Sequence, residues 1–357
     1  IAPTISSIIT TSNDGYYKIG DDVNITVNFS EPVTLSGSNL IITLETGDTD
    51  QQVTITTISG ASSSSGTYTV QSGDESSDLS VSSIDLSGGG TFSDAAGNSM
   101  SSFSIPDGQN LDDTHGIIVD GVVPIDFTVG SVTSTGGTST ADYWNVTNSG
   151  ISIVVPMDNS DASFQGGTVQ LQAEIDGNSF VDLGASSTIT GSEVSSGTKT
   201  VTASATGTGD TDVEDLTGFG EGGIISIRAV ITDVAGNSTI GTESGTTLTI
   251  DETSATIDNV VSTAVAGLYG IGGQINLLLT FTENVTLTGG NLIVQINASS
   301  NSLTQNIISN SSSTLLSYIV AEDDESTALS VDGITPGAGT ITDIAGNPTS
   351  DFTVPDG

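Results

Sequence analysis

Hydrophobic and polar residues alternate along many short stretches of the chain. A two-residue period is typical of β-strands with one buried face, because successive side chains of a strand point to opposite faces. The clearest stretches are residues 23–29, 40–46, 53–59, 168–175 and 224–231. Clusters of Gly, Asn, Asp and Ser separate them, and no run combines the 3.6-residue period of a helix with helix caps. The pattern predicts an all-β fold without helices.

Long parts of this pattern occur twice. The matching pairs are residues 15–40 with 267–292, 68–81 with 318–331, and 92–108 with 341–357. Repetition at a fixed distance is the signature of tandem structural units. The first and last parts of the chain are therefore expected to fold alike.

A short motif, D-x-A-G-N, marks three units rather than two. It starts at Asp94, Asp233 and Asp343, and linker-like stretches stand on both sides of the middle copy. We therefore predict three tandem domains: residues 1–121, a variant unit at 122–252, and 253–357. Short strands and regular turns in units of this length favour immunoglobulin-like β-sandwiches in an elongated array. The chain has no Cys, so packing alone must hold the sheets together.

Charge narrows the possible functions. The 357 residues include 43 Asp and Glu against 3 Lys and Arg, a formal net charge of −40. Such a polyanion has no electrostatic attraction to nucleic acid or to an anionic membrane surface, and we expect neither as a partner. No thiolate site is possible, and His115 is the single histidine. We expect no enzymatic activity, since no nucleophile motif accompanies that histidine. Ion pairs can neutralise at most three carboxylates, so the rest must be spread out, screened or bound to cations.

Two sequence pieces resemble a known family. The stretch GYYKIGDDVNITVNFSEPVTLSG (15–37) and the later FSDAAGNSMSSF (92–103), with a VD-containing linker, resemble bacterial Ig-like and cadherin-like repeats of giant secreted surface proteins and adhesins. The middle unit is similar to a variant repeat of such arrays. The resemblance implies extended stalks, commonly stiffened by Ca²⁺ at the domain junctions, and no enzymatic activity.

Topology gives a separate reason to expect cations. In an immunoglobulin-like sandwich, the turn after the second strand, the turn after the sixth strand and the incoming linker meet at one pole. The carboxylates expected there are Glu31 and Asp94 in the first unit, Asp120, Asp158 and Asp233 in the second, with Asp161 as a further candidate, and Asp251, Glu252, Glu283 and Asp343 in the third. Clustered carboxylates without Lys or Arg beside them repel one another unless a cation lies among them. Six to eight oxygen ligands are what Ca²⁺ requires.

A simpler interpretation stays open for the same residues. The D-x-A-G-N motif could be only a tight turn in which Asp accepts backbone N–H groups, Gly adopts a positive φ, and Asn tolerates one or adds a carbonyl ligand. Acidic stretches at Asp74 and Glu75, and in residues 213–223, are better explained as solvated loops. Tyr143 and Trp144 could stack on a sugar, but core packing is the better explanation.

These expectations combine into one functional hypothesis with two alternatives. The chain is expected to be a secreted, cell-surface stalk of Ig-like repeats, joined through Ca²⁺ and partnered by neighbouring repeats of the same chain or by identical subunits. The last unit lacks a counterpart of residues 109–120, and we expect the natural chain to go on into further repeats. Alternatively, a neighbouring subunit could complete the unit in a self-polymerising filament or sheath. The second alternative is a module that binds surface glycans or proteins through a β-face.

Overall fold

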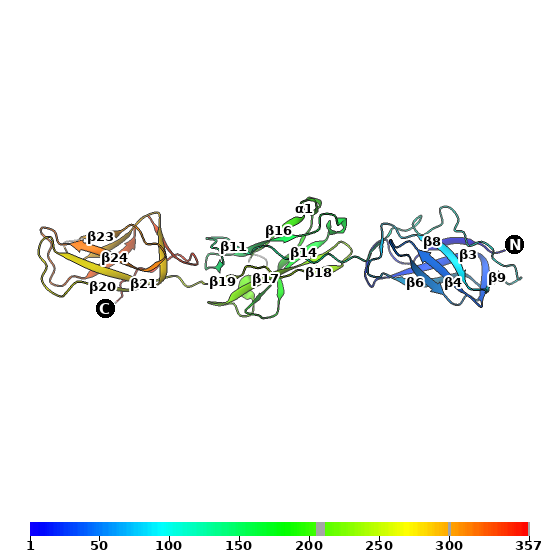
Figure 1. Ribbon diagram of the computed structural model, residues 1–357, viewed down its shortest axis with the longest axis horizontal. Helices are drawn as coiled ribbons and strands as arrows, with labels where there is room; N and C mark the ends of the chain where they lie inside the picture. The colour runs from blue at the N-terminus through cyan, green and yellow to red at the C-terminus, as the bar shows by residue number, and fades with distance from the viewer. Residues whose placement is uncertain (205–210, 299–300, 356–357) are drawn as a thin grey trace.

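The computed structural model describes residues 1–204, 211–298 and 301–355. Figure 1 shows the strands in three groups along one long axis, with the N-terminus at one end of the row. We call residues 1–121, 122–252 and 253–357 the first, middle and last segments; their use as domain boundaries stays a prediction. The fold is all-β, and each group of strands is built as a β-sandwich, as the alternating pattern predicted.

The first segment pairs its strands in a four-stranded sheet and two three-stranded sheets. The orders are β1-β3-β6 with β9 on β3, β5-β4-β8, and β2-β10-β7. The last strand, β10, runs parallel to β2 and antiparallel to β7. The bounds are β1 (Ile5–Ile9), β2 (Gly15–Lys18), β3 (Asp22–Ser36), β4 (Asn39–Leu44), β5 (Gln51–Ile55), β6 (Ala61–Thr69), β7 (Glu75–Ser76), β8 (Val81–Ser87), β9 (Thr91–Asp94) and β10 (Ile117–Asp120).

The middle segment packs a three-stranded sheet, β11-β13-β16, against a six-stranded sheet, β12-β19-β17-β14-β15 with β18 on β17. Its last strand, β19, again runs parallel to an early strand, β12. The bounds are β11 (Thr133–Thr135), β12 (Tyr143–Trp144), β13 (Gly150–Pro156), β14 (Thr168–Ile175), β15 (Val181–Thr188), β16 (Thr198–Ser204), β17 (Ile224–Thr232), β18 (Ser238–Ile240) and β19 (Leu248–Ile250), with 3₁₀ turns η1 (Ala162–Phe164) and η2 (Val213–Asp215).

The last segment has a sheet β20-β21-β24 with β26 on β21, and a sheet β23-β22-β25. The bounds are β20 (Ile257–Ser262), β21 (Gln274–Thr288), β22 (Leu292–Ile296), β23 (Ser302–Gln305), β24 (Ser311–Ile319), β25 (Val331–Pro336) and β26 (Thr340–Asp343). It repeats most of the first segment, with β20, β21 and β24 in the places of β1, β3 and β6.

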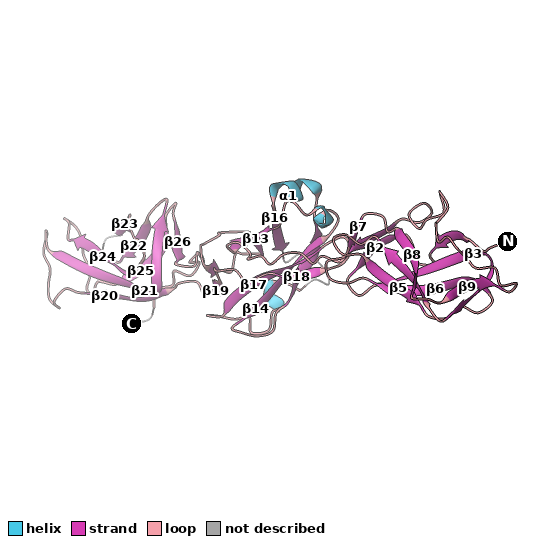
Figure 2. Ribbon diagram, turned by 45° about the vertical axis from the view of Figure 1, so that its right-hand side comes forward, coloured by secondary structure: helices cyan, strands magenta, loops and turns pink. Residues whose placement is uncertain are grey.

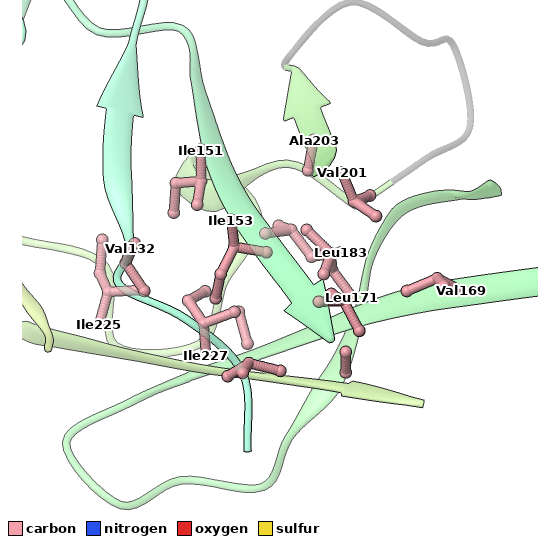
Figure 3. Close-up of a cluster of buried hydrophobic side chains, with 14 of the residues drawn as sticks. Val132, Ile151, Ile153, Val169, Leu171, Leu183, Val201, Ala203, Ile225 and Ile227 are labelled. Carbon is pink, nitrogen blue, oxygen red and sulfur yellow. The ribbon is translucent and has the colours of Figure 1, made fainter. Parts of the chain in front are cut away.

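Alternation along the strands produces the cores. In β17, every second residue from Ile225 to Ile231 is buried, and these side chains meet Ile151 and Ile153 of the opposing sheet (Figure 3). Trp144 belongs to the same core and is 1% exposed, which confirms core packing over a sugar platform. Burial of such aliphatic and aromatic side chains supplies most of the stability of a chain without disulfides.

One helix corrects the expectation that the chain has none. Helix α1 (Gly191–Ser196) projects from the middle segment (Figure 2). Thr190 and Glu193 form a reciprocal capping box at its start, and Gly197 ends it with a left-handed φ of 69°. The T-x-x-E signal was present in the sequence, but a helix of six residues is too short to show a 3.6-residue period. No helix in the described parts of the chain is long and apolar enough to cross a bilayer.

The strands β3 and β21 also differ from expectation. Glu31 and Glu283 were expected in a turn between two strands, but each lies within a single 15-residue strand. The pairing register breaks around them: β21 pairs with β24 up to Thr280 and again at Val285, and it pairs with β26 from Val285 onward, all within one sheet. The strand therefore continues through an irregular bend instead of reversing, and the glutamate lies in that bend.

Candidate metal centres between the segments

Three carboxylates from distant parts of the chain meet between the middle and last segments. Ligand oxygens of Asp251, Glu283 and Asp343 all lie within 4.8 Å of one another. Asp251 directly follows β19, Glu283 lies in the bend of β21, and Asp343 ends β26. Pairing of Val285 with Asp343 holds the last two elements side by side. The structure thus brings together three of the four residues predicted for this site.

Asp343 holds the tight turn with one carboxylate oxygen and leaves the other oxygen available. Its Oδ1 accepts the N–H groups of Gly346 and Asn347, each at 2.8 Å, so it stabilises the tight turn. Gly346 has the positive φ, 96°, that this turn requires. The second oxygen, Oδ2, is buried and has no hydrogen-bond partner among the described residues. A buried carboxylate oxygen without a partner is costly, and a cation would satisfy it.

The electrostatics of the site favour a bound positive charge. Burial, followed by the negative charges of Asp343 and Glu221, raises the pKa of Asp251 from 3.8 to about 6. Burial and then the charges of Asp343, Asp251 and Glu221 raise the pKa of Glu283 from 4.5 to about 7. Both shifts have the same physical origin: ionised carboxylates are crowded together in a partly desolvated place. A proton or a metal ion relieves that repulsion.

Glu221 is a member of this group that the sequence reasoning missed. It comes from the acidic loop before β17, and its Oε2 accepts hydrogen bonds from the Glu252 N–H at 3.1 Å and from the Thr253 hydroxyl at 3.0 Å. Glu252 itself lies outside the carboxylate group; burial and then Glu214 raise the pKa of its side chain. The preceding segment therefore contributes Glu221 in addition to the linker aspartate.

A related but looser set of acids lies between the first and middle segments. Among the described residues, the group of three acids with ligand oxygens within 4.8 Å of one another is Asp251, Glu283 and Asp343. At the first junction the Asp233 Oδ2, unlike that of Asp343, accepts the Asn237 side-chain amide at 3.0 Å.

Asp120 ends β10 and is 9% exposed; its Oδ1 accepts the Val122 N–H at 3.2 Å, and its buried Oδ2 has no partner within the described chain. Burial, with the charges of Asp233, Asp161 and Glu75 and against the opposing Val122 hydrogen bond, raises the pKa of Asp120 from 3.8 to about 6. Glu75, in β7, is the acid of the preceding segment whose charge acts on the linker aspartate here, as Glu221 is at the other junction.

Asp158, which the sequence predicted as a ligand, is less well placed to act on Asp120 than Asp161 is. The Asp158 Oδ1 accepts the N–H and hydroxyl of Ser160 at 2.8 and 2.7 Å, and the hydroxyl bond lowers the pKa of Asp158. It lines a junction groove of about 540 Å³ together with Asp120, Asp161 and Glu75. Asp161 is the acid of this stretch whose charge acts on Asp120.

In the first segment, the protein itself satisfies Asp94. Its Oδ1 accepts the N–H groups of Ala96 and Asn98, and its Oδ2 accepts the Asn98 side-chain amide at 2.6 Å. The amide bond is the main reason that the pKa of Asp94 is lowered. Glu31 is half-buried in the bend of β3. This pole fits the interpretation of a tight turn better than that of a metal site.

The asparagine of the D-x-A-G-N motif has a role that the sequence did not reveal. At both junctions its Nδ2 donates to the carbonyl of the linker aspartate: Asn237 to Asp120 at 2.9 Å, and Asn347 to Asp251 at 2.8 Å. Its Oδ1 accepts a backbone N–H from the preceding segment, that of Ile19 or Val146. We call these contacts the asparagine bridges. The positive φ belongs to the glycine alone, and the asparagine joins two segments.

Taken together, each junction offers oxygen ligands only. The carboxylates come from the preceding segment, the linker, the bend or turn of the following segment, and the D-x-A-G-N turn. Such oxygen-rich sets from several chain segments fit Ca²⁺ and not Zn²⁺, which prefers nitrogen and sulfur ligands. The residues present therefore fit the cation that the sequence led us to expect.

Comparisons with family models and with curated proteins gave no match. Among solved structures, a crystal structure of domains from titin aligns over 99% of this chain and 99% of that chain, with 10% identity and a TM-score of 0.24. A purple acid phosphatase from yellow lupin (Lupinus luteus) seeds aligns over 71% of this chain and 43% of that chain, with 7% identity and a TM-score of 0.19. Scores this low carry no argument about function.

Proposed function

We propose that this protein is an extracellular structural stalk whose successive β-sandwiches are joined by Ca²⁺. The carrying observation is the close group of Asp251, Glu283 and Asp343 at the second junction, where Glu221 adds its charge. A looser set at the first junction consists of Glu75, Asp120, Asp161 and Asp233. Each set combines acids of the preceding segment, the linker and the following segment. A cation held there would fix the direction in which each segment continues the row.

The chain cannot neutralise these sites with its own side chains. Its three basic residues are Lys18, Lys199 and Arg228. The Lys199 ammonium forms an ion pair with Glu193 at 2.8 Å, and the Arg228 guanidinium lies over the ring of Phe180, both within the middle segment. Lys18 reaches the first junction, but its ammonium donates to the Gly236 carbonyl at 3.3 Å. Cations from solution are therefore the available counter-charge for the carboxylates.

An extracellular setting fits sites of this kind. Extracellular calcium modules bind with dissociation constants of about 10⁻⁴ to 10⁻³ M, because external Ca²⁺ is abundant. Partly exposed carboxylates without a dedicated ligand loop are suited to that range. The stalk interpretation follows from the row of sandwiches in Figure 1, whose ends are far apart.

Calcium titration of matched variants tests the proposal. Asp251→Asn keeps the acceptor for Asn347 but removes a charge at the second junction. Asp85→Asn removes the same charge from the exposed face of β8. We expect calorimetry to show Ca²⁺ binding that Asp251→Asn weakens at one site and Asp85→Asn leaves intact. At a free Ca²⁺ concentration 100 times the dissociation constant, each site should stabilise its junction by about 2.7 kcal/mol.

Small-angle scattering provides the second measurement. EDTA at fixed ionic strength should lower the melting temperature and broaden the distribution of end-to-end distances of the row. Unchanged melting and unchanged dimensions in EDTA would refute the calcium proposal. Magnesium at the same concentration serves as the ion control, because Mg²⁺ gives up its bound water reluctantly and needs a stricter octahedral site.

A further inference from the structure

The asparagine bridges at the two junctions are built alike. At the first junction the Ile19 N–H donates to the Asn237 Oδ1 at 3.2 Å, and at the second the Val146 N–H donates to the Asn347 Oδ1 at 2.9 Å. In each case the same asparagine also donates to the carbonyl of the linker aspartate. The acids around the two bridges can therefore be compared one by one.

The aspartates of the two D-x-A-G-N turns differ in how many of their oxygens the protein uses. The Asp343 Oδ2 is buried and has no hydrogen-bond partner among the described residues. The Asp233 Oδ2 accepts the Asn237 amide at 3.0 Å, whereas the Asn347 amide makes its second contact with the Asp251 carboxylate, at 3.2 Å. A cation that binds the Asp233 Oδ2 must displace a hydrogen bond to a charged oxygen, and a cation at the Asp343 Oδ2 has no donor to displace.

The further acid that the following segment adds differs in the same direction. At the second junction Glu283 brings a ligand oxygen within 4.8 Å of those of Asp251 and Asp343. At the first junction the further acid is Asp161, and its Oδ1 already accepts the N–H and the hydroxyl of Ser163 at 2.9 and 2.5 Å. Fewer carboxylate oxygens are therefore left for a cation at the first junction.

A basic side chain also contacts the turn at the first junction. Lys18 donates from its ammonium to the Gly236 carbonyl at 3.3 Å. At the second junction the matching contact is neutral, because there the Asn145 amide donates to the Ala345 carbonyl at 2.7 Å. Each of these donors comes directly before the residue whose N–H forms the asparagine bridge. A positive charge held on the D-x-A-G-N turn repels an incoming cation, and only the first junction has one in the part of the chain that the structure describes.

We propose that the second junction binds Ca²⁺ about tenfold or more tightly than the first, so that the row stiffens in two steps as the Ca²⁺ concentration rises. The inference rests on the proposed function and adds the order in which its two sites fill. A factor of about ten is the lower end of what one hydrogen bond to a charged group contributes. Between the two steps, the middle and last segments form one stiff unit, and the first segment turns about the linker that follows Asp120.

The bridged amides report on the two junctions separately in the whole chain. Hydrogen exchange at Ile19 and at Val146 is followed while free Ca²⁺ is raised from EDTA-buffered levels at fixed ionic strength. Each amide is protected by the asparagine side chain of its own junction, so its protection rises when that junction is stiffened. Half of the gain in protection at Val146 should be reached at a free Ca²⁺ concentration about tenfold or more below that for Ile19.

Matched variants assign the difference to particular side chains. Glu283→Gln should raise the Val146 midpoint by about tenfold or more and leave the Ile19 midpoint unchanged. Lys18→Gln keeps a hydrogen-bond donor but removes the charge, and it should lower the Ile19 midpoint by about two- to fivefold at low salt without moving that of Val146. Asp85→Asn, on the exposed face of β8, should change neither midpoint.

Two results would overturn the inference while leaving Ca²⁺ binding itself in place. They are equal midpoints at the two amides, and protection of Ile19 at lower Ca²⁺ than Val146. A Glu283→Gln variant that moves both midpoints together would also count against it, because the two sites would then not be separate. If Ca²⁺ protects neither amide, the calcium proposal itself fails, so the two failures are distinguishable.

Discussion

Replacing Asn347 by alanine should loosen the junction between the middle and last segments without disturbing either sandwich. Asn347 is 0% exposed, and its side chain forms the asparagine bridge at this junction. It donates to the Asp251 carbonyl at 2.8 Å and accepts the Val146 N–H at 2.9 Å. The turn itself should survive, because the Asp343 carboxylate holds it through backbone N–H groups.

The size of the effect follows from these two bonds. A hydrogen bond between neutral groups contributes about 0.5–1.5 kcal/mol net, so losing two should cost about 1–3 kcal/mol of junction stability. The longer contact from Asn347 to the Asp251 carboxylate, at 3.2 Å, places the expected value in the upper half of that range. This corresponds to roughly 30- to 150-fold easier opening of the junction.

Hydrogen exchange at the Val146 amide is the direct assay, since that N–H is protected by the Asn347 side chain. In Asn347→Ala, the protection of the Val146 amide against exchange should fall by the same roughly 30- to 150-fold. Asn98→Ala is the matched control. Its amide donates only to Asp94 of its own turn, at 2.6 Å, so Val146 should be unaffected. Unchanged protection of Val146 in Asn347→Ala, or an equal loss in Asn98→Ala, would refute the reasoning.

Three further outcomes are expected. In EDTA, the free energy of unfolding should fall as the pH rises from about 4 to 7, because the folded protein holds a proton on Glu283 that the unfolded chain has released. Urea titrations of Glu283→Gln should show a shallower decline of this free energy with pH, and an identical slope contradicts the prediction. Glu193→Ala should cost about 3 kcal/mol in denaturant unfolding, because it leaves the ammonium of buried Lys199 without a counter-ion and with the Thr188 carbonyl as its acceptor. Lys199→Met should cost less, and the reverse order refutes the argument. Tyr68→Phe should lower stability by about 1–3 kcal/mol, because the buried Asp74 carboxylate loses the Tyr68 hydroxyl at 2.6 Å as one of its donors. Tyr318→Phe should cost less, since its aspartate partner is half-buried, and equal losses in thermal melts count against this.

The sequence carried much of the fold and part of the sites. Alternation predicted the strands because each sandwich buries one face of each strand, and β17 shows the same alternation in its burial. The convergence of Asp251, Glu283 and Asp343 also followed from topology. Glu283 does not lie in a turn between two strands, as predicted, but in a bend within β21. Because β21 pairs with β26, Glu283 still lies at the same pole as Asp343.

What the sequence could not supply depends on contacts between segments. Glu221 looked like one more acid in a solvated loop, and only the return of that loop to the linker brings it beside Asp251. The role of Asn347 was equally hidden, because an asparagine after glycine fits a turn regardless of what its amide reaches. Asp158 and Asp161 are three positions apart, and each accepts the N–H and hydroxyl of the serine two residues further on, so their local sequence does not tell which one acts on Asp120.

The placement of the linker aspartates has a consequence for how the protein matures. Asp120 ends β10, and Asp251 directly follows β19, so the strand that closes one sandwich also positions a carboxylate at the junction with the next. A nascent chain emerges from its N-terminus, and its units fold in that order. The surface of the preceding unit that each new unit contacts therefore forms only after that preceding unit has completed its last strand. We expect the row to assemble in one direction, and a defect in an early closing strand to misalign everything that follows it.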